Sequence, residues 1–261
     1  MSKPTPAITL FRGSDTPRQY VWSPFVTKLE FRLRVGGLTY TPACGSPRAS
    51  PTGQIPYITL TSQDKDGDVK SLGDSTRITQ HFIAASALRD LNAGLSAKDA
   101  ALDVALRCLI EERLNACHGY ERWVVNYYTM RDGVLGSIPW APRVLIGLLA
   151  ARKNGVKMEA AGLAGLSEEE VFRRVEAVWE VVARLLESAR PKREGDGWWV
   201  LAGKEPTEAD ATVFGFAASV MVCGAAGGSK RLLREKFPVI VEWAGWVHKG
   251  WFKEYELWKE E

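Results

Sequence analysis

Short apolar runs dominate the first third of the chain, a pattern typical of β-strands. Residues 7–11 and 56–61 are rich in Ile, Leu, Thr and aromatic side chains, and residues 69–72 add a shorter run. Residues 38–41 predict a further, weaker strand. The polar segment 62–68 separates the last two runs and predicts a hairpin loop.

Helical signals lie between and after these strands. Ser23-Pro24 predicts a helix start, because serine is a good N-cap and proline is favoured at the first helical position. Apolar residues then recur at helical spacing until Gly36-Gly37 ends the helix. A second helix begins at Asp74-Ser75. This order of elements predicts a thioredoxin-like α/β domain over residues 1–91.

From Ser96 onward the pattern is almost entirely helical, and it predicts an all-α domain over residues 96–261. A short linker with Gly94 is the expected boundary between the two domains. The expected helices cover residues 96–131, 142–153, 167–190 and 207–224, and a last helix begins at Pro238.

Two capping boxes mark helix starts in this second part. Ser167 precedes Glu170 at the spacing at which serine and glutamate each bond the other's backbone amide, and Thr207 stands in the same relation to Asp210. We interpret both boxes as folding elements.

Composition excludes several classes of protein. The chain has 261 residues, of which 46% are hydrophobic and 25% are charged, as in ordinary globular proteins. A net charge of +3 is too small to indicate a nucleic-acid or membrane-surface partner. The first residues, Met-Ser-Lys-Pro-Thr-Pro, do not resemble a signal peptide, so we expect a cytoplasmic protein.

Cysteine and histidine spacing predicts no metal site. The four cysteines lie far apart without a CxxC pair, which indicates reduced thiols, and the three histidines are equally scattered. We therefore expect no metal cofactor.

The segment Gln54-Ile55-Pro56 is the first candidate for binding chemistry. A proline directly before a strand is compatible with a cis bond, which would present the Ile55 backbone edge to solvent. Such an edge binds a peptide ligand as an extra strand.

Asp74-Ser75 and Ser23 are the other candidates, since each lies at a helix N-terminus. The amides and the Ser75 hydroxyl could hold a carboxylate there, and a thiol near Ser23 would lose its proton more easily. In each case a simple N-cap without a ligand is the competing interpretation.

Read together, these motifs resemble the cytosolic glutathione transferases over roughly residues 8–252. The nearest likeness is to the fungal branch similar to the failed-axon-connections and metaxin-like transferases. The resemblance is carried by residues 23–30, 53–58, 73–75 and 201–211.

The resemblance implies a role for each candidate residue. Ile55, with Pro56, is the backbone clamp for glutathione, Asp74 and Ser75 bind its γ-glutamyl end, and Gln54 contacts its glycyl end. Ser23 is the first candidate for the hydroxyl that activates the thiol. The loop before it is long and polar, so Tyr20, Thr16 and Ser14 stay open as alternatives.

The resemblance also implies the reaction. Glutathione, bound as a thiolate, would add to a small apolar electrophile in a homodimeric enzyme, with a possible place in fungal secondary metabolism. One alternative is double-bond isomerisation by reversible thiolate addition, and another is a non-catalytic binding protein with the same fold.

Overall fold

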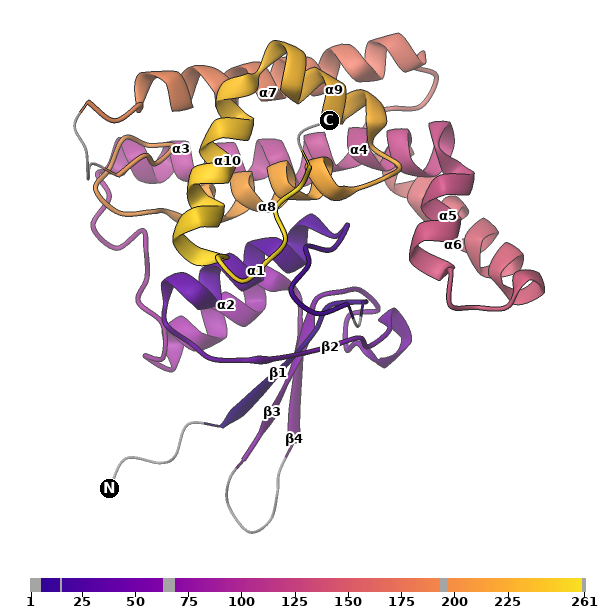
Figure 1. Ribbon diagram of the computed structural model, residues 1–261, viewed down its shortest axis with the longest axis horizontal. Helices are drawn as coiled ribbons and strands as arrows, with labels where there is room; N and C mark the ends of the chain where they lie inside the picture. The colour runs from indigo at the N-terminus through magenta and orange to yellow at the C-terminus, as the bar shows by residue number, and fades with distance from the viewer. Residues whose placement is uncertain (1–5, 15, 63–68, 193–196, 260–261) are drawn as a thin grey trace. The chain divides into compact units, whose positions relative to one another are not determined.

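The computed structural model describes residues 6–14, 16–62, 69–192 and 197–259, and it divides the chain into two units (Figure 1). The first unit comprises residues 1–95, 206–219 and 244–261. The second comprises residues 96–205 and 220–243. The sequence pattern predicts one continuous second domain over 96–261, whereas two of its C-terminal segments group with the first unit.

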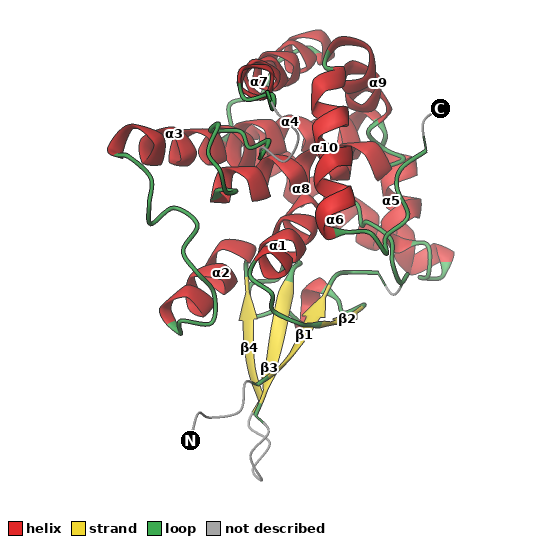
Figure 2. Ribbon diagram, turned by 60° about the vertical axis from the view of Figure 1, so that its left-hand side comes forward, coloured by secondary structure: helices red, strands yellow, loops and turns green. Residues whose placement is uncertain are grey.

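A four-stranded mixed sheet forms the base of the first unit (Figure 2). Its strands are β1 (Ala7–Phe11), β2 (Thr41–Ala43), β3 (Tyr57–Thr61) and β4 (Val69–Gly73), in the order β2-β1-β3-β4. The β1 and β2 strands are parallel, and the other two pairs are antiparallel. The strand β2 begins later than the pattern indicates, because Leu38 and Tyr40 pack against the core instead. The connection 63–68 lies outside the described residues.

The two predicted helices of this unit are confirmed as α1 (Pro24–Val35) and α2 (Ser75–Ala84). Their apolar sides meet the sheet in one core cluster, which consists of Ile8, Leu10, Leu29, Leu33, Ile58, Leu60, Ile78, Phe82 and Leu88. The short 3-10 turn η1 (Pro47–Ala49) lies between β2 and β3.

Long-range packing brings the two C-terminal segments into the first unit. Gly215, in α8 (Glu208–Val222), lies so close to α1 that a Cβ there would be 2.5 Å from the Pro24 carbonyl oxygen. The Phe214 ring lies 5.5 Å from that of Phe31 and 5.3 Å from that of Phe252. These contacts join residues far apart in the chain, so local patterns do not reveal them.

The regular secondary structure in the described residues of the second unit is all helical. Its helices are α3 (Ala97–Cys108), α4 (Asn115–Tyr120), α5 (Tyr127–Leu135), α6 (Trp140–Ala160), α7 (Glu168–Ser188) and α9 (Gly227–Lys236), with the first part of α10 (Pro238–Trp251). Two π-helical stretches, η2 (Leu109–Leu114) and η3 (Glu121–Val125), flank α4.

The helix expected over residues 96–131 breaks at Asn126, where the backbone leaves the helical region at φ −112° and ψ 36°. The helix α9 is missing from the sequence expectation, and it begins with two glycines, Gly227 and Gly228. Glycine lowers helix propensity and so weakens the local signal.

Two buried tryptophans of the second unit, Trp198 and Trp243, donate hydrogen bonds to backbone carbonyls. The Trp243 indole nitrogen donates to the Trp198 carbonyl at 2.7 Å, and that of Trp198 donates to the Leu186 carbonyl at 2.8 Å. Both rings are buried while their polar atoms keep partners, as is usual for indoles.

The capping box predicted at Ser167 is confirmed, and at Thr207 the structure shows the predicted bond from the Thr207 amide to the Asp210 carboxylate. Ser167 and Glu170 form the full capping box at the start of α7. At the start of α8 the Asp210 carboxylate accepts from the Thr207 amide at 2.7 Å and from its hydroxyl at 2.9 Å. Thr207 and Asp210 are buried, whereas the bonds of the Ser167 box are exposed.

Among the described residues no single helix is long and apolar enough to cross a membrane, although the bent pair α8 and α9 meets the length and composition criterion when taken together.

Because the Thr207–Asp210 box is buried and the Ser167–Glu170 box is exposed, we predict that their removal lowers the free energy of unfolding by different amounts. Ser167→Ala should lower the free energy of unfolding by about 1 kcal/mol, the usual value for a solvated N-cap. Asp210→Ala should lower it by about 3 kcal/mol, because it leaves a buried amide without a partner. Urea denaturation of both variants measures the difference, and equal losses would contradict this interpretation.

Candidate functional site

Three of the predicted site segments meet at one end of the sheet. The register pairs Phe11 at the end of β1 with Tyr57 at the start of β3, and Tyr57 with Gly73 at the end of β4. The loop before Ser23, the Ile55-Pro56 bond and the start of α2 therefore lie at this end. The Asp74 amide donates to the Pro56 carbonyl at 3.3 Å, which joins the second and third segments directly.

The loop after β1 also approaches Ile55. Gly13 has a φ of +78°, and a Cβ at this position would lie 2.8 Å from the Ile55 Cδ1 atom. A residue with a side chain would strain both the backbone and this contact. Gly13 thus keeps the loop that leads to Ser23 against the Ile55 side chain.

The Ile55-Pro56 peptide bond is cis, as the sequence indicates. Ile55 is half-buried and Gln54 is exposed. Among the described residues none forms a backbone hydrogen bond with Ile55. The amide and carbonyl of Ile55 are therefore open to pairing with an extended peptide.

The start of α2 has the features of an anion site. The Asp74 Oδ1 atom accepts from the Arg77 amide at 2.9 Å, which confirms the N-cap. Ser75 is the first residue of the helix and is 2% exposed. The next hydroxyl, that of Thr76, accepts from the buried Lys28 Nζ at 3.0 Å. A helix N-terminus with a cation nearby favours a bound carboxylate.

Ser23 occupies the N-cap position of α1, but its hydroxyl makes no capping hydrogen bond. The side-chain cap is thus wrong as an explanation of this serine. The preceding carbonyl, that of Trp22, accepts from the Ser219 hydroxyl at 2.6 Å. Within the described part of the chain the half-buried Ser23 hydroxyl has no hydrogen-bond partner, so it can donate to a ligand.

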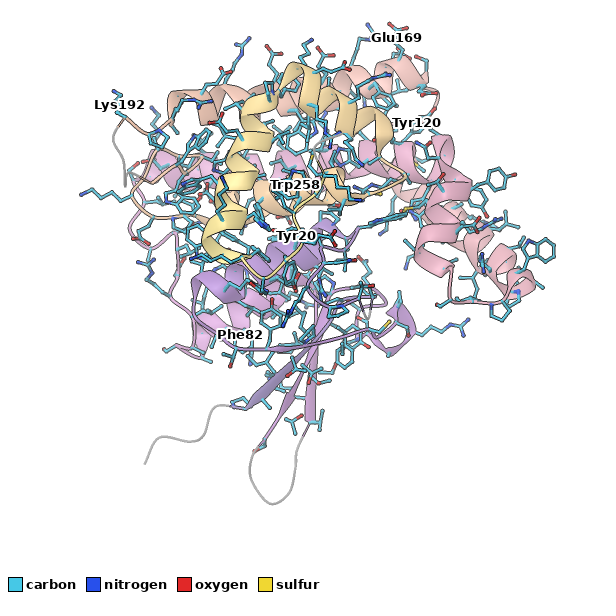
Figure 3. All side chains as sticks on the ribbon, in the orientation of Figure 1. Tyr20, Phe82, Tyr120, Glu169, Lys192 and Trp258 are labelled. Atoms are coloured by element: carbon cyan, nitrogen blue, oxygen red, sulfur yellow. The ribbon has the colours of Figure 1, made fainter. Side chains whose placement is uncertain are left out.

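The alternative hydroxyls of this loop are already engaged. The buried Tyr20 hydroxyl lies 2.9 Å from the His248 Nδ1 atom, and its ring packs against that of Trp258 at 5.7 Å (Figure 3). Burial raises the pKa of Tyr20 far above its usual value. The Ser14 hydroxyl bonds that of Thr16 at 3.1 Å. Of the four candidates, only Ser23 has a hydroxyl without a hydrogen bond among the described residues, whereas the exposed Thr16 hydroxyl accepts from Ser14 and keeps its own proton to donate.

Comparisons with known proteins agree with this geometry. Residues 24–130 match the family model described as the glutathione S-transferase N-terminal domain. Solved structures match nearly the whole chain. The chain has the glutathione transferase fold.

Three of these structures, all from named transferases, illustrate the likeness. GSTFuA3 from Phanerochaete chrysosporium has 17% sequence identity and a TM-score of 0.57, covering 98% of this chain and 100% of its own. URE2P6 from the same organism, in complex with oxidized glutathione, has 15% identity and a TM-score of 0.54, covering 94% and 91%. Omega 2S from Trametes versicolor, in complex with 2,4-dihydroxybenzophenone, has 16% identity and a TM-score of 0.52, covering 97% and 93%.

A search of curated proteins found no match. The comparisons identify the glutathione transferase fold without distinguishing a branch, so the metaxin-like branch stays a prediction.

Sequence reasoning missed a buried charge pair behind the loop that leads to Ser23. The Arg12 Nε atom lies 3.0 Å from the Glu30 Oε1 atom, and both side chains are buried. Glu30 follows Val26 and precedes Leu33 at helical spacing, so it lies on the apolar side of α1. A carboxylate on an apolar helix face is the signal that could have revealed it.

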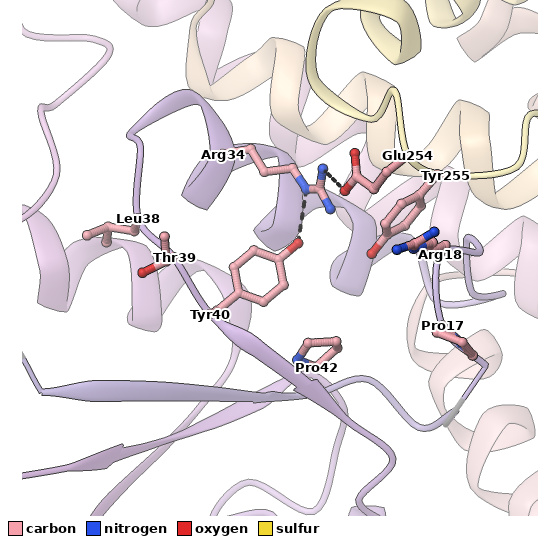
Figure 4. A pocket seen from close by; sticks show the side chains of 9 residues that line it. All are labelled: Pro17, Arg18, Arg34, Leu38, Thr39, Tyr40, Pro42, Glu254 and Tyr255. Carbon is pink, nitrogen blue, oxygen red and sulfur yellow. Dashed lines mark hydrogen bonds and ion pairs between the residues drawn. The ribbon is translucent and has the colours of Figure 1, made fainter.

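A cavity of about 400 Å³ lies beside the other end of α1 (Figure 4). The Arg34 guanidinium at its wall donates to the Tyr40 hydroxyl at 3.0 Å and pairs with Glu254 at 2.6 Å. Ser23 and Arg34 lie at opposite ends of the helix, but Pro17 and Arg18, from the loop that leads to Ser23, also line this cavity.

The Tyr20–His248 bond predicts a pH-dependent contribution to stability. Burial lowers the pKa of His248, which favours the neutral ring, and we assign Nδ1 as the acceptor of the Tyr20 hydroxyl proton. Tyr20→Phe should lower the free energy of unfolding by about 1 kcal/mol at about pH 8. That difference should shrink as the pH falls through the lowered pKa of His248, because imidazolium has no acceptor nitrogen.

Urea denaturation of wild type and Tyr20→Phe between about pH 5 and about pH 8 measures this effect. Tyr128→Phe, at an exposed ring, is the matched control and should change little. A Tyr20→Phe cost that stays constant across this range would refute the assignment of Nδ1 as the acceptor.

Proposed function

We propose that this protein is a glutathione transferase that binds glutathione at the Ser23 end of the sheet and adds its thiolate to a small apolar electrophile. The observation that carries the proposal is the unengaged Ser23 hydroxyl at the N-terminus of α1. It lies at the same end of the sheet as the open Ile55 backbone and the start of α2. Together these groups offer what a γ-glutamyl thiol peptide requires.

Each residue then has one task in binding. The Ile55 amide and carbonyl pair with the cysteinyl backbone of glutathione, in the manner of an added strand. Asp74 holds the γ-glutamyl ammonium group, and the Ser75 hydroxyl with the first amides of α2 holds its carboxylate. Gln54, exposed beside Ile55, contacts the glycyl end.

The chemical step depends on the ionisation of the bound thiol. The Ser23 hydroxyl donates to the sulfur, and the positive end of the α1 dipole favours the thiolate. The thiol proton leaves to solvent, and the sulfur lone pair forms a C–S bond with the electrophilic carbon. The π bond of the electrophile breaks as this bond forms, and its electron pair moves onto the neighbouring atom, which takes up a proton from solvent. Tyr20 remains the alternative donor, but its hydroxyl is bonded to His248 and its ring is buried.

Two relatives support the ligand classes of this proposal. URE2P6 is described with oxidized glutathione, and Omega 2S with the aromatic compound 2,4-dihydroxybenzophenone. An apolar, aromatic electrophile is accordingly the first substrate class to try.

Isomerisation uses the same site, because only the fate of the adduct differs. If the thiolate adds to a conjugated alkene, the C–C bond rotates and the thiolate leaves, then the product has the mass of the substrate. Mass spectrometry of the reaction mixture separates this outcome from conjugation. A homodimer, a cytoplasmic location and a role in secondary metabolism stay predictions from the family resemblance.

Calorimetric titration with glutathione tests the binding site. Ser75→Ala should weaken binding about tenfold, because it removes a hydrogen bond to a charged group. Ser23→Ala should change the dissociation constant less than about twofold, because a neutral thiol gains little from the hydroxyl. Ser14→Ala and Tyr20→Phe are the matched controls, and both should bind glutathione as wild type does.

The pH dependence of thiolate absorbance in the bound state tests the activation step. Ser23→Ala should raise the pKa of the bound thiol by about one unit, whereas Tyr20→Phe should leave it unchanged. A wild-type protein that does not bind glutathione would overturn the proposal and favour a binding protein with this fold. A shift with Tyr20→Phe and none with Ser23→Ala would transfer the role to Tyr20.

A further inference from the structure

One buried guanidinium contacts the chain on both sides of Ser23. Arg12 is 2% exposed, and its terminal nitrogens donate to the carbonyls of Thr16, at 3.3 Å, and of Gln19. Both carbonyls belong to the loop that precedes Ser23. The Arg12 Nε atom lies 3.0 Å from Glu30, which is in α1 beyond Ser23.

Glu30, the partner of Arg12, is itself held in place by further hydrogen bonds. Its carboxylate is fully buried and also accepts from the hydroxyls of Tyr255, at 2.7 Å, and of Tyr40, at 3.2 Å. A buried carboxylate with several donors is held in one place, because each lost bond leaves a desolvated charge. Arg12 therefore ties the loop to a rigid point on the helix that Ser23 begins.

The C-terminal segment adds a second attachment to the same loop. The Glu256 amide donates to the Arg18 carbonyl at 2.9 Å, and its carboxylate accepts from the Gln19 side chain at 3.0 Å. The Arg12 guanidinium also lies over the Tyr255 ring, 5.5 Å from its centroid. The loop is thus held both by Arg12 and by residues 255–256.

We propose that Arg12 is a positioning residue for Ser23: by fixing the loop carbonyls of Thr16 and Gln19 to the Glu30 carboxylate, it sets where the Ser23 hydroxyl meets the glutathione sulfur. This inference rests on the proposed function. Arg12 touches neither the thiol nor the electrophile, and it acts through the geometry of the loop. A hydroxyl displaced by a fraction of an ångström donates a weaker hydrogen bond to the thiolate.

The Arg12→Lys variant isolates the geometric role. Lysine keeps a positive charge beside Glu30, so the buried carboxylate retains an ionic partner. It loses the planar fork that reaches two carbonyls and the carboxylate together. The protein should fold, whereas Arg12→Met would leave a buried charge unpaired and is the variant more prone to misfold.

Thiolate absorbance of bound glutathione as a function of pH is the measurement, and it requires no electrophile. Arg12→Lys should raise the pKa of the bound thiol by about one unit, which lowers the thiolate fraction below that pKa about tenfold. The dissociation constant for glutathione should stay within about twofold, because Ile55, Asp74 and Ser75 are untouched. A purely structural role would instead weaken binding without moving the thiol pKa.

A double-mutant cycle and a matched control complete the test. In the Ser23→Ala background, Arg12→Lys should cause no further change in the thiol pKa, because the hydroxyl that it positions is gone. Arg190→Lys changes an arginine that binds both Glu242 oxygens at 2.8 Å in the second unit, and it should leave the pKa unchanged.

The outcomes separate this inference from the proposed function. If wild type binds glutathione and Ser23→Ala shifts the thiol pKa while Arg12→Lys does not, the positioning role is overturned and the transferase site stands. Additive shifts in the double variant would also overturn it, because Arg12 would then act independently of Ser23. If wild type does not bind glutathione, the proposed function itself fails.

Discussion

The carboxylate of Glu30, buried in the middle of α1, is the constraint on which the first unit depends. A buried charge is tolerated only when it is paired and hydrogen-bonded, and here the partners come from three separate parts of the chain. Arg12 follows β1, Tyr40 precedes β2 and Tyr255 lies near the C-terminus. Burial raises the pKa of Glu30, whereas Arg12 and the two hydroxyls oppose that shift. All three partners meet at the Oε1 atom of Glu30, so the pairing of this oxygen requires these segments to be in place together.

The same constraint explains why the end of the chain belongs to the first unit. Phe252 and Tyr255 bring aromatic rings to the α1 face that carries Glu30, and the Arg34 guanidinium lies 4.2 Å from the Phe252 centroid. At the start of α8, Glu208 pairs with the buried Arg32 at 2.6 Å. Apolar burial supplies the larger part of such stability, while the ion pairs fix which segments associate. The unit is assembled from three stretches of sequence for this reason.

Around Ser23, three of the backbone carbonyls have side-chain hydrogen-bond partners. The Trp22 carbonyl is bonded by Ser219, the Thr16 and Gln19 carbonyls are bonded by Arg12, and the Ile55 backbone is left open. The Ser23 hydroxyl makes no capping hydrogen bond, although a serine at the N-cap position usually makes one. A residue that does not make the local interaction its type favours often lies at a functional position.

Local signals in the sequence determined the helix starts at Ser23-Pro24, Asp74 and Ser167, the strands β1, β3 and β4, and the cis bond at Pro56. Each depends on neighbours within a few residues, such as a cap, a proline or alternating apolar side chains. The sequence also supplied the candidate site segments, through motifs at the ends of these elements, and these stay predictions. Only the tertiary structure decided which hydroxyl of the 14–23 loop is unengaged, that Arg12 and Glu30 pair, and that residues 206–219 and 244–261 join the first unit. Those outcomes depend on contacts between residues distant in the chain, whose pairing no local pattern encodes.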